Sequence, residues 1–124
     1  MNALFLVMTG GAIGAGLRHL VGRAALATLG PAFPYGTLIV NLAGSLAMGV
    51  LAGTVARLAN GDWWRLLLGV GVLGGFTTFS AFSLDAVLML ERGAWMQMLV
   101  YVLVSVVGSV AALAAGLQLT RVMA

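Results

Sequence analysis

The sequence predicts an all-α membrane protein with four transmembrane helices, the third of which is broken near its middle. Of the 124 residues, 62% are hydrophobic and only 7% are charged, and the mean hydropathy is +1.13. Soluble domains carry about a quarter charged residues, whereas one membrane span needs about 20 apolar residues, so four spans occupy nearly the whole chain. A glycine pair followed by hydroxyl side chains interrupts the third span and predicts the break.

The spans follow one another through short loops and form a single integral-membrane domain over residues 1–124. A Gly-Pro pair and a second proline close the first span, and an Asn-Gly-Asp turn closes the second. Two adjacent tryptophans, which favour the membrane interface, open the third. A Glu-Arg-Gly turn leads into the fourth, and loops this short make consecutive helices antiparallel. The spans cover about residues 4–29, 35–58, 63–90 and 94–120.

The segment from Gly74 to Ser83 is the most informative part of the chain. Adjacent glycines weaken a helix, and the hydroxyls that follow them compete for its backbone hydrogen bonds. Inside hydrocarbon, such a break is tolerated only where the freed backbone groups are buried in protein or line a watery cavity. The break therefore favours an ion or solute site at mid-membrane over a glycine-kinked packing helix.

Composition removes several classes of function. The chain has no cysteine, which excludes disulfides, iron–sulfur clusters and thiol chemistry. Its six basic residues are all arginines and lie scattered, so they predict no nucleic-acid surface. The lone histidine, His19, has neither a second histidine nor a cysteine to complete a metal site. The sequence offers no carboxylate pair or nucleophile–base pair for hydrolysis, so we do not expect an enzyme.

The placement of the arginines gives almost no bias toward one orientation in the membrane. Four spans put both termini and the loop between the second and third spans on one side. Three arginines lie on that side and two on the other, and Arg18 reaches towards the second group. Because Lys/Arg asymmetry sets orientation, such a chain can insert both ways and form an antiparallel homodimer; one orientation fixed by other factors is the alternative. Small residues spaced four apart suit close packing, within one chain or against a second copy.

Two polar stripes run along otherwise apolar helices at four-residue spacing, which places each stripe on one helix face. Hydroxyl and amide N–H donors suit an anion that must shed water. The alternative is hydrogen-bond glue between helices, each contact contributing about 0.6 kcal/mol. Two stripes beside a broken helix favour a pathway. They comprise Thr37, Asn41 and Ser45 in the second span and Gln97, Tyr101, Ser105 and Ser109 in the fourth.

Aromatic and charged side chains within the spans add further candidates. Phe76, Phe79 and Phe82 recur every three residues; their positive ring edges attract an anion, although ordinary aromatic packing explains the stripe equally well. Arg18 lies deep in the first span, where a charge is costly, and we expect it to be structural or vestibular. Asp85 is the only acid inside a span, and the residues leave its role open.

Three motifs resemble the Fluc-type fluoride channels, also called CrcB proteins, and the resemblance extends over essentially the whole chain. The segments Gly10–Arg18, Gly36–Ser45 and Gly71–Ser80 resemble the signatures of that family's first, second and third helices. The resemblance implies a fluoride-selective ion channel that passively exports fluoride across the bacterial inner membrane. It also implies an antiparallel, dual-topology homodimer in the lipid bilayer, with two fluoride pathways.

The resemblance also assigns site residues by position. Asn41 is expected to line the fluoride pathway, Phe79 and Phe82 to present ring edges to the ion, and a polar track to follow along the fourth helix. A central, structural Na⁺ is implied at the helix break, bound by the backbone carbonyls of Gly74 and Thr77 from each subunit, and hard cations do prefer oxygen ligands. The polar track comprises Tyr101, Ser105 and Ser109.

The chain departs from the family pattern at three positions. His19 stands where tyrosine is frequent, Leu46 replaces a common aromatic, and Ala81 removes one hydroxyl donor from the track. A proton-coupled small multidrug exporter is the alternative function. Such exporters need an ionisable carboxylate in the first span, whereas the only acid within a span here is Asp85 in the third. A structural subunit without transport is a further alternative, and it would leave both stripes as helix glue.

Overall fold

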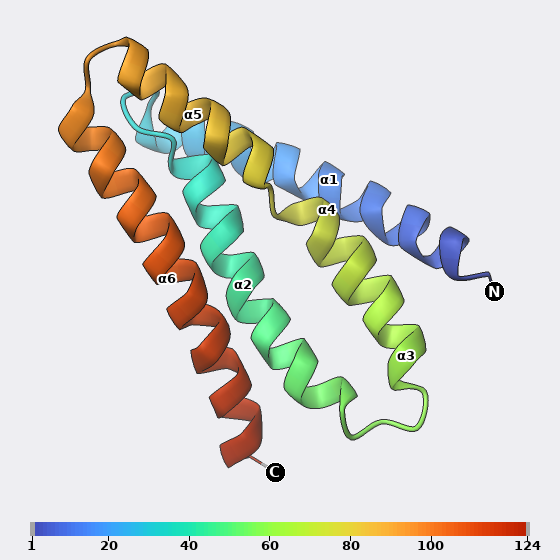
Figure 1. The fold of residues 1–124 in the computed structure, drawn as a ribbon. Helices are drawn as coiled ribbons and strands as arrows, with labels where there is room; N and C mark the ends of the chain where they lie inside the picture. The colour runs from blue at the N-terminus through green and yellow to red at the C-terminus, as the bar shows by residue number, and fades with distance from the viewer. Residues whose placement is uncertain (1, 124) are drawn as a thin grey trace.

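The structure, a computed structural model, describes residues 2–123 and contains four helical regions long and apolar enough to cross a membrane (Figure 1). They confirm the four predicted spans. The second helix ends a few residues earlier than expected, at Val55, and the last one continues to Val122. The three unbroken helices are α1 (Ala3–Leu29), α2 (Tyr35–Val55) and α6 (Trp95–Val122).

The third span is broken as predicted, but the glycine pair is not the point of the break. Gly74 and Gly75 are helical, and the chain becomes extended at Thr77 and Thr78, whose φ angles are −82° and −152°. Before the break the helix is π-helical, a form usually confined to short bulges near functional sites. The span consists of α3 (Gly61–Trp64), η1 (Arg65–Leu73), α4 (Gly74–Phe76) and α5 (Phe79–Glu91).

Glycines set how closely α2 and α6 approach each other, and the two helices run side by side along most of their length (Figure 1). A Cβ atom on Gly49 would lie 2.9 Å from the main-chain nitrogen of Leu117. One on Gly116 would lie 2.9 Å from the nitrogen of Val50. Small residues of this kind allow helices to associate in lipid, where no hydrophobic force drives them together.

α1 packs against the first half of the third span through glycines on both sides. A Cβ atom on Gly14 would lie 2.9 Å from the nitrogen of Phe76, and one on Gly75 would lie 2.6 Å from the carbonyl oxygen of Gly11. The second glycine of the pair that precedes the break, Gly75, therefore serves close packing. Several of the predicted small-residue pairs are thus used within one chain.

The end of α2 is fastened to the end of α6. Arg57, just after α2, donates a hydrogen bond to the carbonyl of Thr120 near the end of α6. At the start of the third span, Arg65 forms an exposed ion pair with Asp62 at 2.9 Å. The loop between the second and third spans therefore lies at the same end of the molecule as the C-terminal end of α6. This agrees with the expected antiparallel order of the helices.

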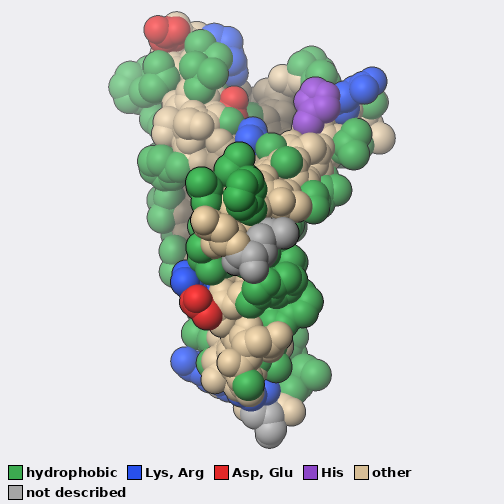
Figure 2. Space-filling model, turned by 90° about the vertical axis from the view of Figure 1, so that its right-hand side faces the viewer, with side chains coloured by type: hydrophobic (Ala, Val, Ile, Leu, Met, Phe, Trp, Pro, Cys, Tyr) green, Lys and Arg blue, Asp and Glu red, His purple; other side chains and the backbone are tan. Residues whose placement is uncertain are grey.

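The buried core is small and lies where the loop after α1 meets α5 and α6. Phe82, Met89 and Tyr101 are buried there, with Phe33 and Met98 packed against them. Elsewhere apolar side chains are widely exposed, and charged side chains gather in a few small groups (Figure 2). A surface with so much exposed apolar area requires lipid or another protein as its neighbour.

Candidate functional site

The helix break is held by the amide of Asn41 on α2. Its Nδ2 donates to the carbonyl of Thr78 at 3.0 Å, and its Oδ1 accepts from the Thr78 N–H at 2.8 Å. One side chain thus satisfies both backbone groups of an extended residue, which in hydrocarbon would otherwise cost several kcal/mol each. The Asn41 side chain lies against the break.

Other side chains satisfy the remaining backbone groups around the break. Arg18 of α1 donates from Nε to the carbonyl of Gly75 at 3.1 Å. The hydroxyl of Thr77 donates to the Leu73 carbonyl at 3.0 Å, and the hydroxyl of Thr78 accepts from the Ala81 N–H at 3.1 Å, which caps α5. The hydrogen bond from Arg18 to the Gly75 carbonyl supports a structural role for Arg18. Arg18 also lines a separate pocket with His19 and Arg23, so a vestibular role stays a prediction.

A groove of about 370 Å³ lies beside the break, between α2, α5 and α6. Five of the six residues expected in an ion pathway line it together, and none of its lining residues is charged. Val106, Val110 and Leu113 of α6 also line it, and all three are exposed apolar side chains. The five residues are Asn41, Phe79, Phe82, Ser105 and Ser109.

The groove contains hydrogen-bond donors that have no partner in the chain. The Ser105 hydroxyl is buried, and within the part of the chain that the structure describes no group bonds to it. A serine in a helix commonly bonds to the carbonyl one turn earlier, so an unpartnered buried hydroxyl calls for an explanation. The Asn41 amide nitrogen has two hydrogens, and one described hydrogen bond, to Thr78, uses it. These donors lie where a bound anion would accept their hydrogen bonds.

The two phenylalanines of the groove differ sharply in their surroundings. Phe79 is 77% exposed, whereas Phe82 is 7% exposed and belongs to the core. Their ring centroids are 5.5 Å apart, with the rings tilted by 45°. Phe79 therefore projects from the surface of the chain, and Phe82 is fixed by its neighbours.

Tyr101 lies behind the groove and does not line it. It is completely buried, between Phe33 and Phe82, at centroid distances of 5.4 and 5.1 Å. Its hydroxyl donates to Oδ2 of Asp85 at 2.9 Å. The sequence does not predict this pairing, because spacing along one helix carries no information about a partner on another.

The residues implied in sodium binding lie at the carboxyl-terminal end of the first half-helix. Gly74 begins α4 and Thr77 follows it. In residues 2–123, no described hydrogen bond ends on the carbonyl oxygen of Gly74 or of Thr77. Carbonyl oxygens at a helix C-terminus carry partial negative charge, so both groups have the chemistry that a hard cation requires.

Comparison with known proteins places this arrangement in a family. Residues 5–117 match the family described as "CrcB-like protein, Camphor Resistance (CrcB)". The chain belongs to the CrcB family. Its relatives include the "Fluoride-specific ion channel FluC" of Sphingopyxis alaskensis, 57% identical over 98% of this chain and 97% of that protein. The proteins of the same name from Chelativorans sp. and Phenylobacterium zucineum are 58% and 56% identical, each over 98% of this chain and 98% and 97% of their own lengths.

The CrcB match confirms the resemblance drawn from the three motifs, because the matched region contains all of them. It also includes the break and the whole groove, from Asn41 to Leu113. The relatives are bacterial, and the four spans make this chain a multi-pass membrane protein.

Proposed function

We propose that this CrcB-family chain is a fluoride-selective channel that lets fluoride leave the cytoplasm passively across the inner membrane. The observation that carries the proposal is the groove beside the helix break, which unpartnered donors and two phenylalanines line together without a charged residue. Its relatives named as fluoride-specific channels support the substrate. A channel is not an enzyme, and the proposal requires neither ATP nor a coupled ion.

The chemistry of the groove suits a small, strongly hydrated anion. Fluoride must exchange its water for other donors, which the Ser105 and Ser109 hydroxyls and the Asn41 amide supply. The N-terminus of α5 begins at the groove and adds a partial positive charge. A full positive charge in the path would hold the anion too tightly, since conduction requires release as well as binding.

The functional unit in this proposal is an antiparallel homodimer. The groove opens at the protomer surface, and the exposed ring of Phe79 stands at it. Polar donors facing lipid are unfavourable, so a second copy is the neighbour that would enclose the pathway. The chain has no cysteine, so an Asn60→Cys variant carries a single label site. Labelling from both faces of a vesicle is expected, and labelling from one face alone would contradict dual topology.

A structural Na⁺ at the dimer centre also belongs to the proposal. The carbonyls of Gly74 and Thr77 would hold it, and it would supply positive charge that fixes the two broken helices against each other. Because the proposed ligand is the carbonyl, Thr77→Ser keeps both that group and the hydroxyl bond to Leu73. Its flux should therefore stay near that of the unchanged protein. A folded but inactive Thr77→Ser variant would show that the threonine side chain itself is required.

Fluoride efflux from liposomes tests the proposed function. The purified protein is reconstituted into vesicles loaded with fluoride, and release is followed with a fluoride electrode, with chloride-loaded vesicles as the control. Rapid release of fluoride with little chloride is expected. No release by folded protein would overturn the proposal and favour an exporter or a structural subunit. Sensitivity of a deletion strain to lipophilic cations would then distinguish the exporter from the structural subunit.

Replacing either groove phenylalanine by isoleucine should reduce fluoride flux while leaving chloride excluded. The two variants should differ in stability, because Phe82 is buried in the core and Phe79 is exposed. Phe82→Ile is expected to lower the free energy of unfolding by about 1–2 kcal/mol, and Phe79→Ile to leave the protomer's stability nearly unchanged. Flux and thermal denaturation of the same preparations measure both effects. Unchanged flux in both variants would remove the rings from the pathway.

A further inference from the structure

The pocket that Arg18 shares with His19 and Arg23, called the basic pocket below, opens between α1, α2 and the start of α5. Its volume is about 330 Å³, and none of the described residues that line it is acidic. His19 and Arg23 are four residues apart on α1, which places them on one face of the helix. His19 is exposed, and Figure 2 shows it (purple) beside arginine side chains. The pocket thus combines two fixed positive charges with one that protonation can add.

Both arginines keep hydrogen-bond donors available in the basic pocket. A guanidinium has five N–H donors, and the hydrogen bond from Arg18 to the Gly75 carbonyl uses only Nε. Within residues 2–123, Arg23 forms no described hydrogen bond or ion pair. Positive charge with free donors in a hollow surface raises the local concentration of anions.

Thr78 joins the basic pocket to the groove beside the break. It lines both cavities, and it is also the residue that the amide of Asn41 holds. An anion in the basic pocket would therefore lie next to the groove, which itself has no charged lining residue. Positive charge placed before the groove gathers anions without holding them inside it, and conduction requires such release.

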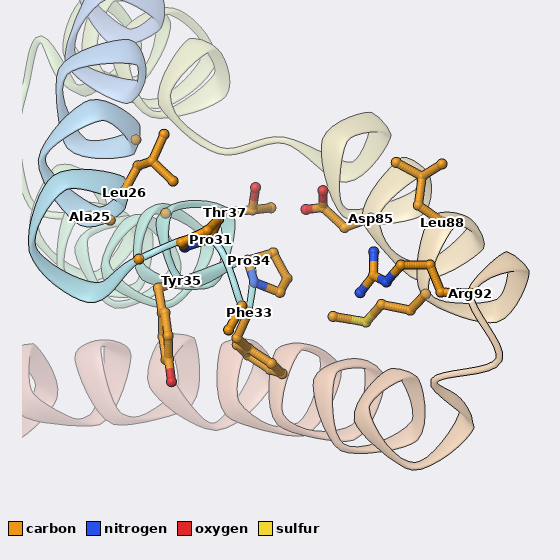
Figure 3. A pocket seen from close by; sticks show the side chains of 15 residues that line it. Ala25, Leu26, Pro31, Phe33, Pro34, Tyr35, Thr37, Asp85, Leu88 and Arg92 are labelled. Atoms are coloured by element: carbon orange, nitrogen blue, oxygen red, sulfur yellow. The ribbon is translucent and has the colours of Figure 1, made fainter.

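The other charged or titratable groups on the elements around α1 lie outside the basic pocket. Asp85 of α5 points toward Thr37 across an adjoining pocket (Figure 3), and it accepts the hydroxyl proton of Tyr101. Arginine stays protonated, whereas histidine is the side chain that ordinarily changes charge between pH 5 and 8. His19 is therefore the lining residue whose charge can vary. The remaining groups are Tyr35 and Arg57 at the two ends of α2, the Arg65–Asp62 pair, and Glu91 and Arg92 at the end of α5.

We propose that His19 makes capture of fluoride in the basic pocket depend on protons, so that the channel takes up the anion more readily in acid. The inference rests on the proposed function. A neutral imidazole leaves the attraction to the two arginines, whereas a protonated one adds a third positive charge and a further N–H donor. One extra charge about 4 Å from the anion in a watery site strengthens binding about fivefold. The gain is present when His19 is protonated and is lost as the pH rises.

The first measurement follows binding and needs no transport. The chain has a single histidine, so the imidazole C–H resonances in its NMR spectrum report His19 alone. At the midpoint of their titration, fluoride should move them toward the positions of the protonated ring, because a bound anion favours the charged form. Gluconate, a bulky anion, keeps the ionic strength constant. Arg23→Gln removes one fixed charge and should reduce the movement at its own midpoint.

The second measurement is the pH profile of fluoride flux well below the half-saturating concentration, where capture limits the rate. Flux is expected to rise about fivefold between about pH 8 and about pH 5, and protein-free vesicles at each pH give the background leak. His19→Gln should flatten the profile, whereas His19→Arg should keep flux high throughout. In the His19→Gln background, Leu20→His is the positional control, because Leu20 is exposed and does not line the basic pocket. Its profile should stay flat.

The outcomes distinguish this inference from the proposed function. A pH dependence that persists in folded His19→Gln, or that Leu20→His restores, would overturn the role of His19. Imidazole resonances of the unchanged protein that ignore fluoride would overturn it even if the variants fail to fold. A lipid phosphate has the same charge, so resonances that respond to phosphatidylglycerol but not to fluoride would assign the pocket to lipid instead. Absence of flux at every pH, with the response to fluoride intact, would overturn the channel function and leave the binding site standing.

Discussion

Replacing Asn41 by aspartate is expected to stop fluoride flux almost completely. The Asn41 amide donates to the carbonyl of Thr78 and accepts from its N–H. Aspartate keeps the acceptor but turns a carboxylate oxygen against that carbonyl, so an attraction becomes a repulsion between two acceptors. It also places a negative charge in a groove that has none. We expect flux to fall by at least about tenfold, since loss of one buried hydrogen bond alone costs about 1–3 kcal/mol.

The matched control is Asn60→Asp, which makes the same chemical change at an exposed loop position. Efflux of both variants is measured in the same vesicles, alongside thermal denaturation. The bracing of the break predicts that Asn41→Asp also lowers stability, which a purely electrostatic effect on the anion would not do. Wild-type flux in a folded Asn41→Asp protein would remove Asn41 from the pathway, and unchanged stability would show that it is not needed to brace the break.

Replacing Gly14 by valine is expected to separate α1 from the third span and to leave little folded protein. A Cβ atom there would lie 2.9 Å from the backbone nitrogen of Phe76, one residue before the break. Backbone atoms cannot move aside as a flexible side chain can, so the helices must part. Overpacking of this kind costs about 3 kcal/mol, and the shift would also pull Arg18 away from the Gly75 carbonyl.

Gly16→Val is the control for this prediction, because no atom lies within 4 Å of a Cβ built at Gly16. Both glycines belong to α1, so helix propensity is affected equally. Size-exclusion chromatography and thermal denaturation in detergent compare the variants. If Gly14→Val proves as stable as Gly16→Val, the close approach of α1 to the third span is not required for folding.

The helices themselves could be predicted from sequence, and the contacts between them could not. Apolar length sets the spans, and the residues around Gly74 placed the break within a few positions. Asn41, Ser105 and Ser109, which periodicity places on helix faces, line one groove in the structure. It carries no information about the rotation and register of one helix against another. Periodicity therefore could not predict the hydrogen bonds from Asn41 to Thr78 and from Tyr101 to Asp85.

Local conformation before the break was the other feature that the sequence left open. In sequence, the π-helical stretch η1 is an ordinary apolar run with no feature that predicts its winding. Of its two glycines, Gly71 lies against α1 and Gly69 faces side chains of α2, and both are buried. Tertiary packing therefore decides the winding of this stretch, and propensity alone predicts only a weakened helix. The glycine pair was assigned to the break, whereas the second glycine of the pair, Gly75, packs closely against α1.

The two braces of the break have a consequence for how the protein is made. Arg18 and Asn41 both belong to helices that precede the third span along the chain and so leave the ribosome before it does. A span with unpaired backbone groups at its centre enters hydrocarbon poorly when alone. Here it arrives beside partners already resident in the bilayer, ready to accept those groups. The order of the helices along the chain thus favours insertion, because the broken third span follows the two helices whose side chains bond to its free backbone groups.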